Sequence, residues 1–335
     1  MQLANSPIET IPTATSQAMK VRFCTLFDWR YLTRGLVMLD SLSSFLRPGD
    51  EVIILAMDDL TKDTLAQYTR DQWRVVSVDD LGDAELTALR QTRPQKEFCW
   101  TCTPALSAWA LRTGSEGDVV VYVDADLVFF GDPRVLLDEL FDQYNILIHE
   151  HRYSPDCAHY EADSGRFNVG LVAFRASAEG RACAEHWRAQ TIDRCELAPG
   201  YCGDQKYLDA WPSLFAGLRI LENIGGGVAP WNVNQYEVEE RGGRPLVNGR
   251  PVIFYHYHAL QTLVEPGFGF VAVRPSVGYR FSRQVMDIFY RKYGKRLRQK
   301  EDDLARKDIA IDGDRVSHFI DVAVGLVVGR YVRVV

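Results

Sequence analysis

The sequence predicts an α/β fold in which helices flank a mostly parallel central sheet. Short apolar runs, such as Val119–Val123, have the length of a strand that is covered on both faces. These runs alternate with longer segments in which apolar residues recur at helical spacing. Such alternation, joined by short right-handed connections, is typical of a largely parallel sheet.

Local patterns predict the individual elements in order. We expect strands over residues 21–27, 51–57, 73–78, 119–123, 145–149, 168–174 and 252–258. We expect helices between them over residues 33–45, 61–70, 83–90, 95–112, 132–141 and 178–195. In the first of these helices, Leu36, Leu39 and Leu42 recur at helical spacing. Asp132 followed by Pro133 is typical of an N-cap and a first helical turn.

The chain divides into three expected parts. Residues 1–19 are rich in Ser, Thr and Pro and lack the basic and apolar regions of a secretory signal, which predicts a disordered leader. Residues 20–275 are expected to form the α/β domain, and residues 276–335 a C-terminal helical extension. No run of eighteen apolar residues occurs, so no membrane-spanning helix is expected.

Composition narrows the class of protein. The formal net charge is −7, which leaves no basic excess to neutralise a nucleic-acid backbone. The seven cysteines are an odd number in a long chain, which indicates reduced thiols and a cytosolic location. Cys99 and Cys102 form a C-x-x-C motif without a second pair, and we interpret them as part of a buried helix face rather than a redox or zinc site.

The helical extension is basic and amphipathic. Phe281, Val285, Ile288 and Phe289 recur at helical spacing among many arginines and lysines. Such a helix can dock on the anionic inner face of a membrane, which would make the protein peripheral. It can also pack on its own domain, and we favour this second interpretation.

Two carboxylates form the strongest local motif. Asp124 and Asp126 follow the apolar run Val119–Val123, and alternate side chains of an extended backbone share a face. They lie beyond the carboxyl end of a parallel strand, where open α/β sheets bind ligands. Adjacent carboxylates repel each other, so a divalent ion that carries substrate phosphates would suit them. The alternative is a turn or helix cap that contains two aspartates by chance.

Three further motifs are weaker when each is taken alone. Asn168 and Gly170 open a short apolar strand, which a simple strand-opening turn also explains. Asp204 and Gln205 stand at the start of an expected helix, where Asp204 could serve only as an N-cap. The last motif has His256 and His258 on one face of a strand, where an imidazole could complete a coordination sphere begun by carboxylates.

The four motifs, in this order, resemble the GT-A-fold nucleotide-diphospho-sugar glycosyltransferases. The resemblance covers about residues 20–265 and is closest to the family of glycogenin and the bacterial lipopolysaccharide galactosyltransferases, glycosyltransferase family 8. It implies a metal-dependent enzyme that moves a hexosyl group from a nucleotide-sugar, expected to be UDP-linked, to a glycan, lipid-linked or other acceptor hydroxyl. Retention of configuration and a role in surface polysaccharide or glycoconjugate synthesis are further expectations.

The resemblance also implies roles for individual residues. Asp124, Asp126 and His256 would hold Mn²⁺ or Mg²⁺, although His258 could exchange roles with His256 because Ala259 stands where the family has glycine. At the reacting carbon, Asp204 would stabilise or attack the sugar and Gln205 would bind its hydroxyls. The expected donor-binding residues are Thr25, Phe27, Asp28, Tyr31, Lys96, Asp124, Ala125, Asp163, Asn168, Gly170 and His258.

Two functional assignments keep alternatives. The family's usual lysine after the histidine motif is missing, so the cation that faces the diphosphate could be Lys96, Arg93 or Arg34. Trp231 and Asn232 would lie on the acceptor side, or would merely form a rigid turn anchored by proline.

Other functions compete with glycosyl transfer. A non-catalytic sugar-nucleotide-binding or membrane-peripheral scaffold would need none of the catalytic residues. A sugar-phosphate nucleotidyltransferase would need a glycine-rich loop after the first strand, and residues 27–30 contain no glycine. An aspartate-nucleophile phosphatase would carry its two aspartates at the first strand, not at Asp124.

Overall fold

A computed structural model describes residues 20–68, 70–140, 143–265, 268–273, 278–309 and 331–333. The expected leader, residues 1–19, lies outside the described residues. So do residues 310–330 and 334–335 of the expected extension.

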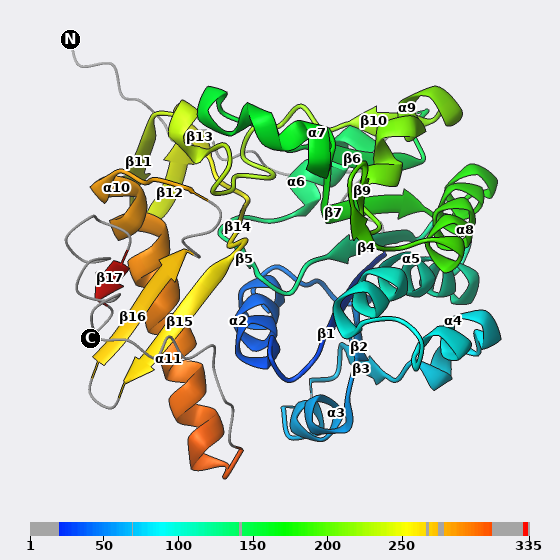
Figure 1. The fold of residues 1–335 in the computed structure, drawn as a ribbon, viewed down its shortest axis with the longest axis horizontal. Coiled ribbons are helices and arrows are strands. Elements are labelled where there is room, and N and C mark those ends of the chain that lie inside the picture. The colour runs from blue at the N-terminus through cyan, green and yellow to red at the C-terminus, as the bar shows by residue number, and fades with distance from the viewer. Residues whose placement is uncertain are drawn as a thin grey trace.

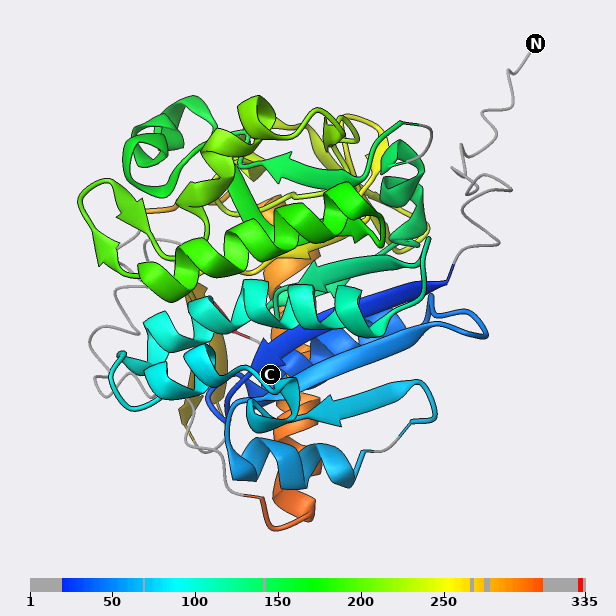
Figure 2. The same cartoon turned by 90° about the vertical axis from the view of Figure 1, so that its right-hand side faces the viewer.

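A seven-stranded sheet forms the centre of the molecule (Figures 1 and 2). Its strand order is β10-β6-β7-β4-β1-β2-β3. All its strands run parallel except β7, which is antiparallel to both neighbours. This confirms the predicted α/β fold with a mostly parallel sheet. The strands are β1 (Val21–Phe27), β2 (Glu51–Ala56), β3 (Trp73–Val76), β4 (Val119–Val123), β6 (Ile146–Glu150), β7 (Phe167–Arg175) and β10 (Leu218–Ile220).

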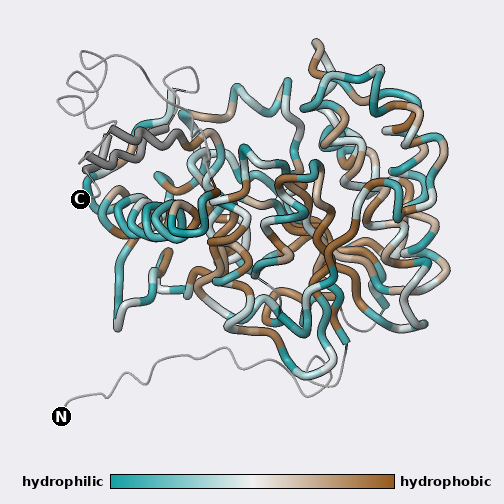
Figure 3. Tube along the Cα trace, turned by 90° about the horizontal axis from the view of Figure 1, so that it is seen from below, coloured by the Kyte–Doolittle hydropathy of each residue, from teal (hydrophilic) through white to brown (hydrophobic). Residues whose placement is uncertain are grey.

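Helices cover both faces of this sheet because its strands are apolar on both sides. In β1, Val21 and Phe23 pack into one core, while Cys24 and Leu26 pack into the other. The first core is covered by α2 (Leu32–Ser43), α3 (Asp59–Ala66) and α6 (Arg134–Leu137). The second core is covered by α4 (Ala84–Leu89), α5 (Gln95–Thr113), α8 (Ala178–Asp193) and α9 (Trp211–Leu214). Hydrophobic residues accordingly concentrate along the central strands (Figure 3).

Smaller sheets complete the fold. β5 (Leu127–Phe129) pairs with β14 (Phe254–His256), antiparallel, beside the end of β4. β8 (Leu197–Ala198) pairs with β9 (Tyr201–Cys202). The remaining strands form two three-stranded sheets: β11 (Val238–Arg241), β12 (Arg244–Val247) and β13 (Arg250–Pro251), and then β15 (Leu260–Glu265), β16 (Phe268–Val273) and β17 (Tyr331–Arg333).

Two predicted elements are less than half as long as the sequence indicated. The expected helix 132–141 is the four-residue α6, followed by a 3₁₀ turn over 138–140. The expected strand 252–258 contains only β14, because the chain leaves the strand after His256 and Ala259 takes up a left-handed backbone conformation with φ of 58°. Cys99 and Cys102 lie on α5 as free thiols, which agrees with the helix interpretation.

The helical extension packs on its own domain. It contains α10 (Arg283–Val285), a π-helical turn (Met286–Tyr290) and α11 (Arg291–Arg306), which lies along α2 (Figure 1). Tyr293, Leu297 and Leu304 are buried. Its cations form ion pairs with acidic residues, among them Lys300 with Asp40 at 2.7 Å. Within the described ranges, none of the helices combines the length and the apolar character needed to cross a bilayer.

Candidate active site

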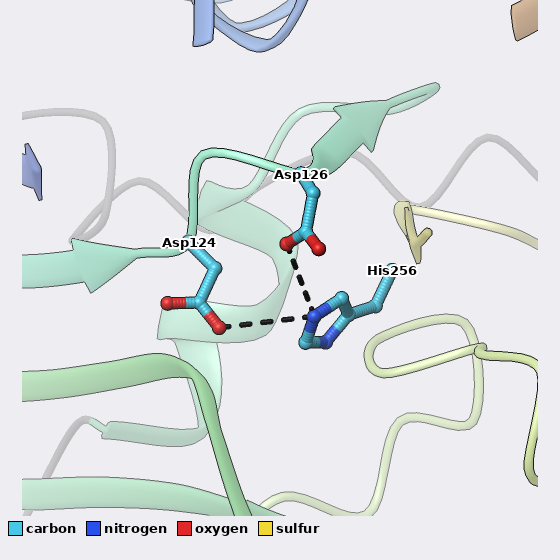
Figure 4. A group of neighbouring side chains, drawn as sticks. All are labelled: Asp124, Asp126 and His256. Carbon is cyan, nitrogen blue, oxygen red and sulfur yellow. Dashed lines mark ion pairs between the residues drawn. The ribbon is translucent and has the colours of Figure 1, made fainter. Parts of the chain in front are cut away.

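A turn between β4 and β5 carries the two aspartates. Asp124 follows the last residue of β4, and its N–H donates a hydrogen bond to the Gly170 carbonyl at 3.0 Å. The Leu127 N–H donates to the Asp124 carbonyl at 3.4 Å and closes the turn. The backbone here is therefore a turn and not the extended segment that the sequence predicted. The turn nevertheless brings the side chains of Asp124 and Asp126 together (Figure 4).

The β5–β14 pairing adds a histidine to these carboxylates. It sets His256 opposite Leu127, and the Tyr257 N–H donates to the Asp126 carbonyl at 2.9 Å. His256 Nε2 lies 3.1 Å from Asp126 Oδ1 and 3.7 Å from Asp124 Oδ2 (Figure 4). One ligand atom from each residue lies within 4.8 Å of the others. Two carboxylate oxygens and one imidazole nitrogen fit Mn²⁺ or Mg²⁺.

Burial couples the charges of this triad, which is Asp124, Asp126 and His256. Burial raises the pKa of Asp124 to about 6, a rise that His256 opposes and Asp126 reinforces. Burial also acts to raise the pKa of Asp126, but the nearby imidazole outweighs it and the pKa lies below its ordinary value. In His256, burial lowers the pKa, yet the two carboxylates outweigh that effect and raise it. The cluster therefore favours positive charge, which a divalent cation would supply.

His258 lies outside this cluster. Its side chain is exposed, and its Nδ1 lies 3.3 Å from the Tyr279 hydroxyl. The structure thus brings His256, and not His258, to the carboxylates. Tyr279 belongs to the expected extension, and nothing in the sequence indicated that it would reach this region.

A third carboxyl, from Asp204, is buried near the triad. Gly203 adopts a φ of 54°, and the turn that follows places Asp204 inside the fold, where it is 2% exposed. Within the described part of the chain, its Oδ2 has no hydrogen-bond partner. Burial raises its pKa well above the usual range, and the charge of Asp124 adds to this. A buried carboxyl with one unpartnered oxygen, beside other carboxyls, is costly to stability, which is typical of a functional group.

Asn168 and Gln205 hydrogen-bond to each other. Asn168 Nδ2 donates to Gln205 Oε1 at 2.8 Å, and Gln205 Nε2 donates to the Ser164 carbonyl at 2.8 Å. Because β7 is antiparallel to β4, the start of β7 with Asn168 lies at the same sheet edge as the end of β4. Their predicted contacts with sugar hydroxyls stay predictions.

The predicted donor residues that follow β1 differ in accessibility. Thr25 and Phe27 are buried, and the Phe27 ring lies so close to α2 that a Cβ on Gly35 would come within 2.6 Å of it. Asp28 is also largely buried and accepts a hydrogen bond from the Arg30 N–H at 3.0 Å. Tyr31 is 38% exposed at the start of α2 and is therefore accessible for stacking.

The three candidate cations occupy different places. Arg34 is 7% exposed, donates to the Leu260 carbonyl at 2.9 Å and lies over the Tyr31 ring at 4.6 Å. No carboxylate forms an ion pair with Arg34 among the described residues. Burial acts to raise the pKa of Asp126, and the positive charge of Arg34, together with His256, lowers it. Arg93 instead donates to Thr101 Oγ1 at 2.6 Å. Lys96 is exposed and lies over the ring of its α5 neighbour Trp100, at 4.5 Å.

The predicted acceptor-side residues are inside the fold. Trp231 is 3% exposed and its Nε1 donates to the His151 carbonyl at 2.9 Å. Asn232 is fully buried, and its Nδ2 donates to the carbonyls of His151 at 2.7 Å and Gly227 at 2.8 Å. These bonds match the rigid-turn interpretation, and an acceptor contact stays a prediction.

Two other predicted positions lie away from the ligand atoms of the triad. Asp163 is exposed on α7 (Glu161–Ser164). Ala125 is buried in the turn between the two aspartates.

His151 also belongs to this region, although no sequence motif indicated it. Its Nε2 lies 3.3 Å from Asn168 Nδ2. His149 and His151 are two residues apart in the sequence. The same spacing indicated that His256 and His258 share one face of a strand.

Comparison with known proteins places the chain in a family. No family model matches it. The Bacillus subtilis protein YfnF is 30% identical over 247 residues, which are 71% of this chain and 81% of YfnF. YfnD of the same organism is 27% identical over 250 residues, 73% of this chain and 80% of YfnD. Both are described as uncharacterized. The chain belongs to the family of YfnF.

The solved structures to which the chain is similar are glycosyltransferases, as the sequence resemblance implied. An active-site mutant of LgtC matches with 15% identity and a TM-score of 0.47, over 71% of this chain and 87% of LgtC. GlyE of Streptococcus pneumoniae matches with 14% identity and a TM-score of 0.47, over 88% and 66%. The bifunctional enzyme WbbM matches with 13% identity and a TM-score of 0.42, over 63% of this chain and 40% of WbbM.

Proposed function

We propose that this protein is a metal-dependent glycosyltransferase. It would move a hexosyl group from a nucleoside-diphosphate sugar, expected to be UDP-linked, to an acceptor hydroxyl. The observation that carries the proposal is the triad of Asp124, Asp126 and His256 beside the buried Asp204, at the edge of the sheet where α/β proteins bind ligands.

The triad would hold Mn²⁺ or Mg²⁺. A bound divalent ion would supply charge neutralisation for the diphosphate leaving group. The residues fit such an ion because one ligand atom from each of them converges on the others. In the described part of the chain, no other cation lies between these atoms.

Arg34 and Tyr31 would bind the nucleotide part of the donor. The Arg34 guanidinium is nearly buried and has no carboxylate partner in the part of the chain that the structure describes, so it is suited to an anion. A diphosphate presents oxygens to which it could donate two hydrogen bonds. The exposed ring of Tyr31 would stack on the base, next to Asp28. Lys96 and Arg93 are less suited, since Lys96 is exposed on α5 and Arg93 donates to groups within the fold.

Asp204 would act at the reacting sugar carbon. Its carboxyl is buried, and its Oδ2 has no hydrogen-bond partner among the described residues. In its ionised form it could stabilise the positive charge that develops there. Retention of configuration, by this stabilisation or by covalent attack, is part of the proposal. Asp163 and Asn168 remain proposed contacts for the donor-sugar hydroxyls. The proposed acceptor is a glycan or a lipid-linked group, and the proposed role is surface polysaccharide synthesis.

Nucleotide release tests this proposal. The purified full chain would be incubated with UDP-, GDP- and dTDP-sugars in Mn²⁺ or in chelator, beside the Asp124→Ala/Asp126→Ala double variant. Asp63→Asn, which alters an exposed carboxylate on α3, is the matched control. We expect release from one donor class that chelator and the double variant abolish and the control keeps. Nucleotide binding that is independent of Mn²⁺, without release, would instead favour a binding scaffold.

A further inference from the structure

The two nitrogens of the His256 ring face different partners. Nε2 points to the carboxylates of Asp126 and Asp124, at 3.1 and 3.7 Å. Nδ1 lies on the other side of the ring, 3.3 Å from Asn168 Oδ1. Which nitrogen carries the proton decides whether His256 can bind a metal ion, since only an unprotonated nitrogen offers a lone pair.

Backbone groups fix the orientation of the Asn168 amide. The Gly170 N–H donates to one end of this amide at 2.9 Å, so that end must be the oxygen. The other end donates to Gln205 Oε1 at 2.8 Å, and Gln205 Oε1 also accepts from the Val169 N–H at 3.4 Å. Reversing the amide would place its NH₂ group against the Gly170 N–H, which would lose a bond and create a repulsion.

This orientation determines the tautomer of the neutral His256 ring. Asn168 Oδ1 can only accept a hydrogen bond, so His256 Nδ1 is the donor and carries the proton. The lone pair of the neutral ring is then on Nε2, which faces Asp124 and Asp126. A hydrogen bond to the second ring nitrogen is the usual way in which proteins orient a metal-binding histidine.

Gly170 makes this contact possible. A Cβ at this position would lie 2.6 Å from Asn168 Oδ1 and 2.8 Å from His256 Nδ1, closer than real Cβ contacts allow. Any side chain would therefore push the asparagine and the histidine apart. The two separate sequence motifs around Gly170 and His256 thus form one structural unit.

We infer that Asn168 is a positioning residue for the metal ligand His256, held in register by Gly170 and Gln205. This inference rests on the proposed function, because it concerns the metal site of the same enzyme. It gives Asn168 a role that does not require contact with the sugar, and it makes Gln205 a support for Asn168 through a bond that Gln205 anchors at the Ser164 carbonyl.

Mn²⁺ binding without any substrate tests the inference. The free Mn²⁺ signal in electron paramagnetic resonance would be titrated with wild type, Asn168→Ala, Asn168→Asp and Gly170→Ala, each first checked for cooperative melting. We expect Asn168→Ala and Gly170→Ala to weaken Mn²⁺ binding about 10- to 100-fold. Asn168→Asp should bind more tightly than Asn168→Ala, because its carboxylate still accepts from Nδ1–H and from the Gly170 N–H, although it loses the bond to Gln205 Oε1. Asn234→Ala, at an exposed asparagine, is the matched control.

The outcomes separate this inference from the proposed function. If wild type binds Mn²⁺ and Asn168→Ala binds it equally well, the positioning role is wrong while the metal site stands. If wild type and Asp126→Ala show the same lack of binding, the proposed metal site is wrong, and the inference falls with it.

A second measurement reads the His256 ring in the wild-type protein itself. In ¹⁵N-histidine-labelled wild type loaded with Mg²⁺, the ring nitrogens of His256, assigned with His256→Gln, should show a protonated Nδ1. A protonated Nε2 would overturn the inference.

Discussion

At the scale of single residues, the site consists of groups that are costly to bury. Asp204 is the clearest case, since its carboxyl is 2% exposed and its Oδ2 has no partner among the described residues. Such a group persists only if it serves a function or if the surrounding structure compensates for it.

Asp204→Asn should therefore separate activity from stability. The substitution keeps the shape but removes the charge that would stabilise the reacting carbon, so we expect kcat to fall about 10²- to 10³-fold. The melting temperature should stay equal or rise, because the substitution replaces a buried carboxyl, whose pKa burial raises, with a neutral amide. Steady-state kinetics and thermal melting check both parts, and a variant with wild-type kcat would contradict the assignment.

Arg34 gives a second prediction at this scale. Its guanidinium is nearly buried and has no carboxylate partner in the described ranges. Arg34→Met should weaken UDP binding in the presence of Mn²⁺ about tenfold or more, since hydrogen bonds to charged groups are worth about 1.5–3 kcal/mol. Calorimetric titration measures this, with Arg30→Gln, at an exposed arginine of the same segment, as the control. Equal affinity in both variants would exclude Arg34 from the diphosphate site.

Sequence patterns could predict the site residues but not all of their roles. Asp124 and Asp126 were recognisable because they follow an apolar strand, and His256 because it repeats at strand spacing. The contact between His256 and Asn168 was not predictable, because it depends on the short β5–β14 pairing and on the direction of β7.

At the scale of elements, Arg188 connects two helices on one face of the sheet through ion pairs with Asp83 and Glu85. Asp83 caps α4 by accepting from the Leu86 N–H at 3.1 Å. Both of its oxygens also accept from Arg188 of α8, each at 2.6 Å. Burial acts to raise the pKa of Asp83, but Arg188 and the cap outweigh burial and lower it.

Loss of this carboxylate should destabilise the fold. We expect Asp83→Ala to lower the free energy of unfolding by about 2–3 kcal/mol, from a lost cap and a lost charge-assisted bond. Because the folded pKa is depressed, this contribution is present above the unfolded pKa near 4 and is lost as the pH falls through the folded value. Urea unfolding at pH 7 measures the loss. Asp79→Ala, which removes an exposed pair with Arg90, should cost less than about 1 kcal/mol. Equal losses would contradict the account.

The limits of sequence prediction at this scale follow from element length. Long periodic helices such as α5 and apolar strands such as β4 were placed to within a residue or so. The three-residue β5 carries too little pattern to be recognised, and β14 was predicted only as part of the longer strand 252–258. These two strands bring His256 to the aspartates.

At the scale of the whole molecule, two buried histidines connect stability to pH. Burial lowers the pKa of His149 to about 3, and the charge of Arg152 adds to this. Burial likewise holds the pKa of His151 well below its ordinary value. The unfolded chain takes up these protons near pH 6.5, whereas the folded chain does not. The stability that they provide is therefore complete above that pH and is lost as the pH falls toward the folded values.

We expect each of these histidines to lower the free energy of unfolding by up to about 1.4 kcal/mol per pH unit below about pH 6, while the raised pKa values of Asp124 and Asp204 act in the opposite direction. Urea unfolding between pH 7.5 and 5 measures this slope. His149→Gln should remove its share of the slope, while His186→Gln, at an exposed position on α8, should not. A slope that His149→Gln leaves unchanged would contradict this prediction.

The packing of the helical extension was only partly predictable. Its amphipathic pattern was clear in the sequence, but the pattern did not say whether α11 would face a membrane or the protein. The acidic partners that settle its packing, such as Asp40 for Lys300, lie far away in the sequence. Tyr279 reaches His258 for the same reason, through tertiary contact alone.

The central claim is that Asp124, Asp126 and His256 bind a catalytic divalent ion. Anomalous diffraction at the manganese edge, from crystals grown with Mn²⁺ and UDP, tests it most directly. We predict one peak within coordination distance of Asp124, Asp126 and His256 Nε2, shared with the diphosphate oxygens. A manganese ion bound to UDP elsewhere, or UDP bound at this edge without an ion, would contradict the account.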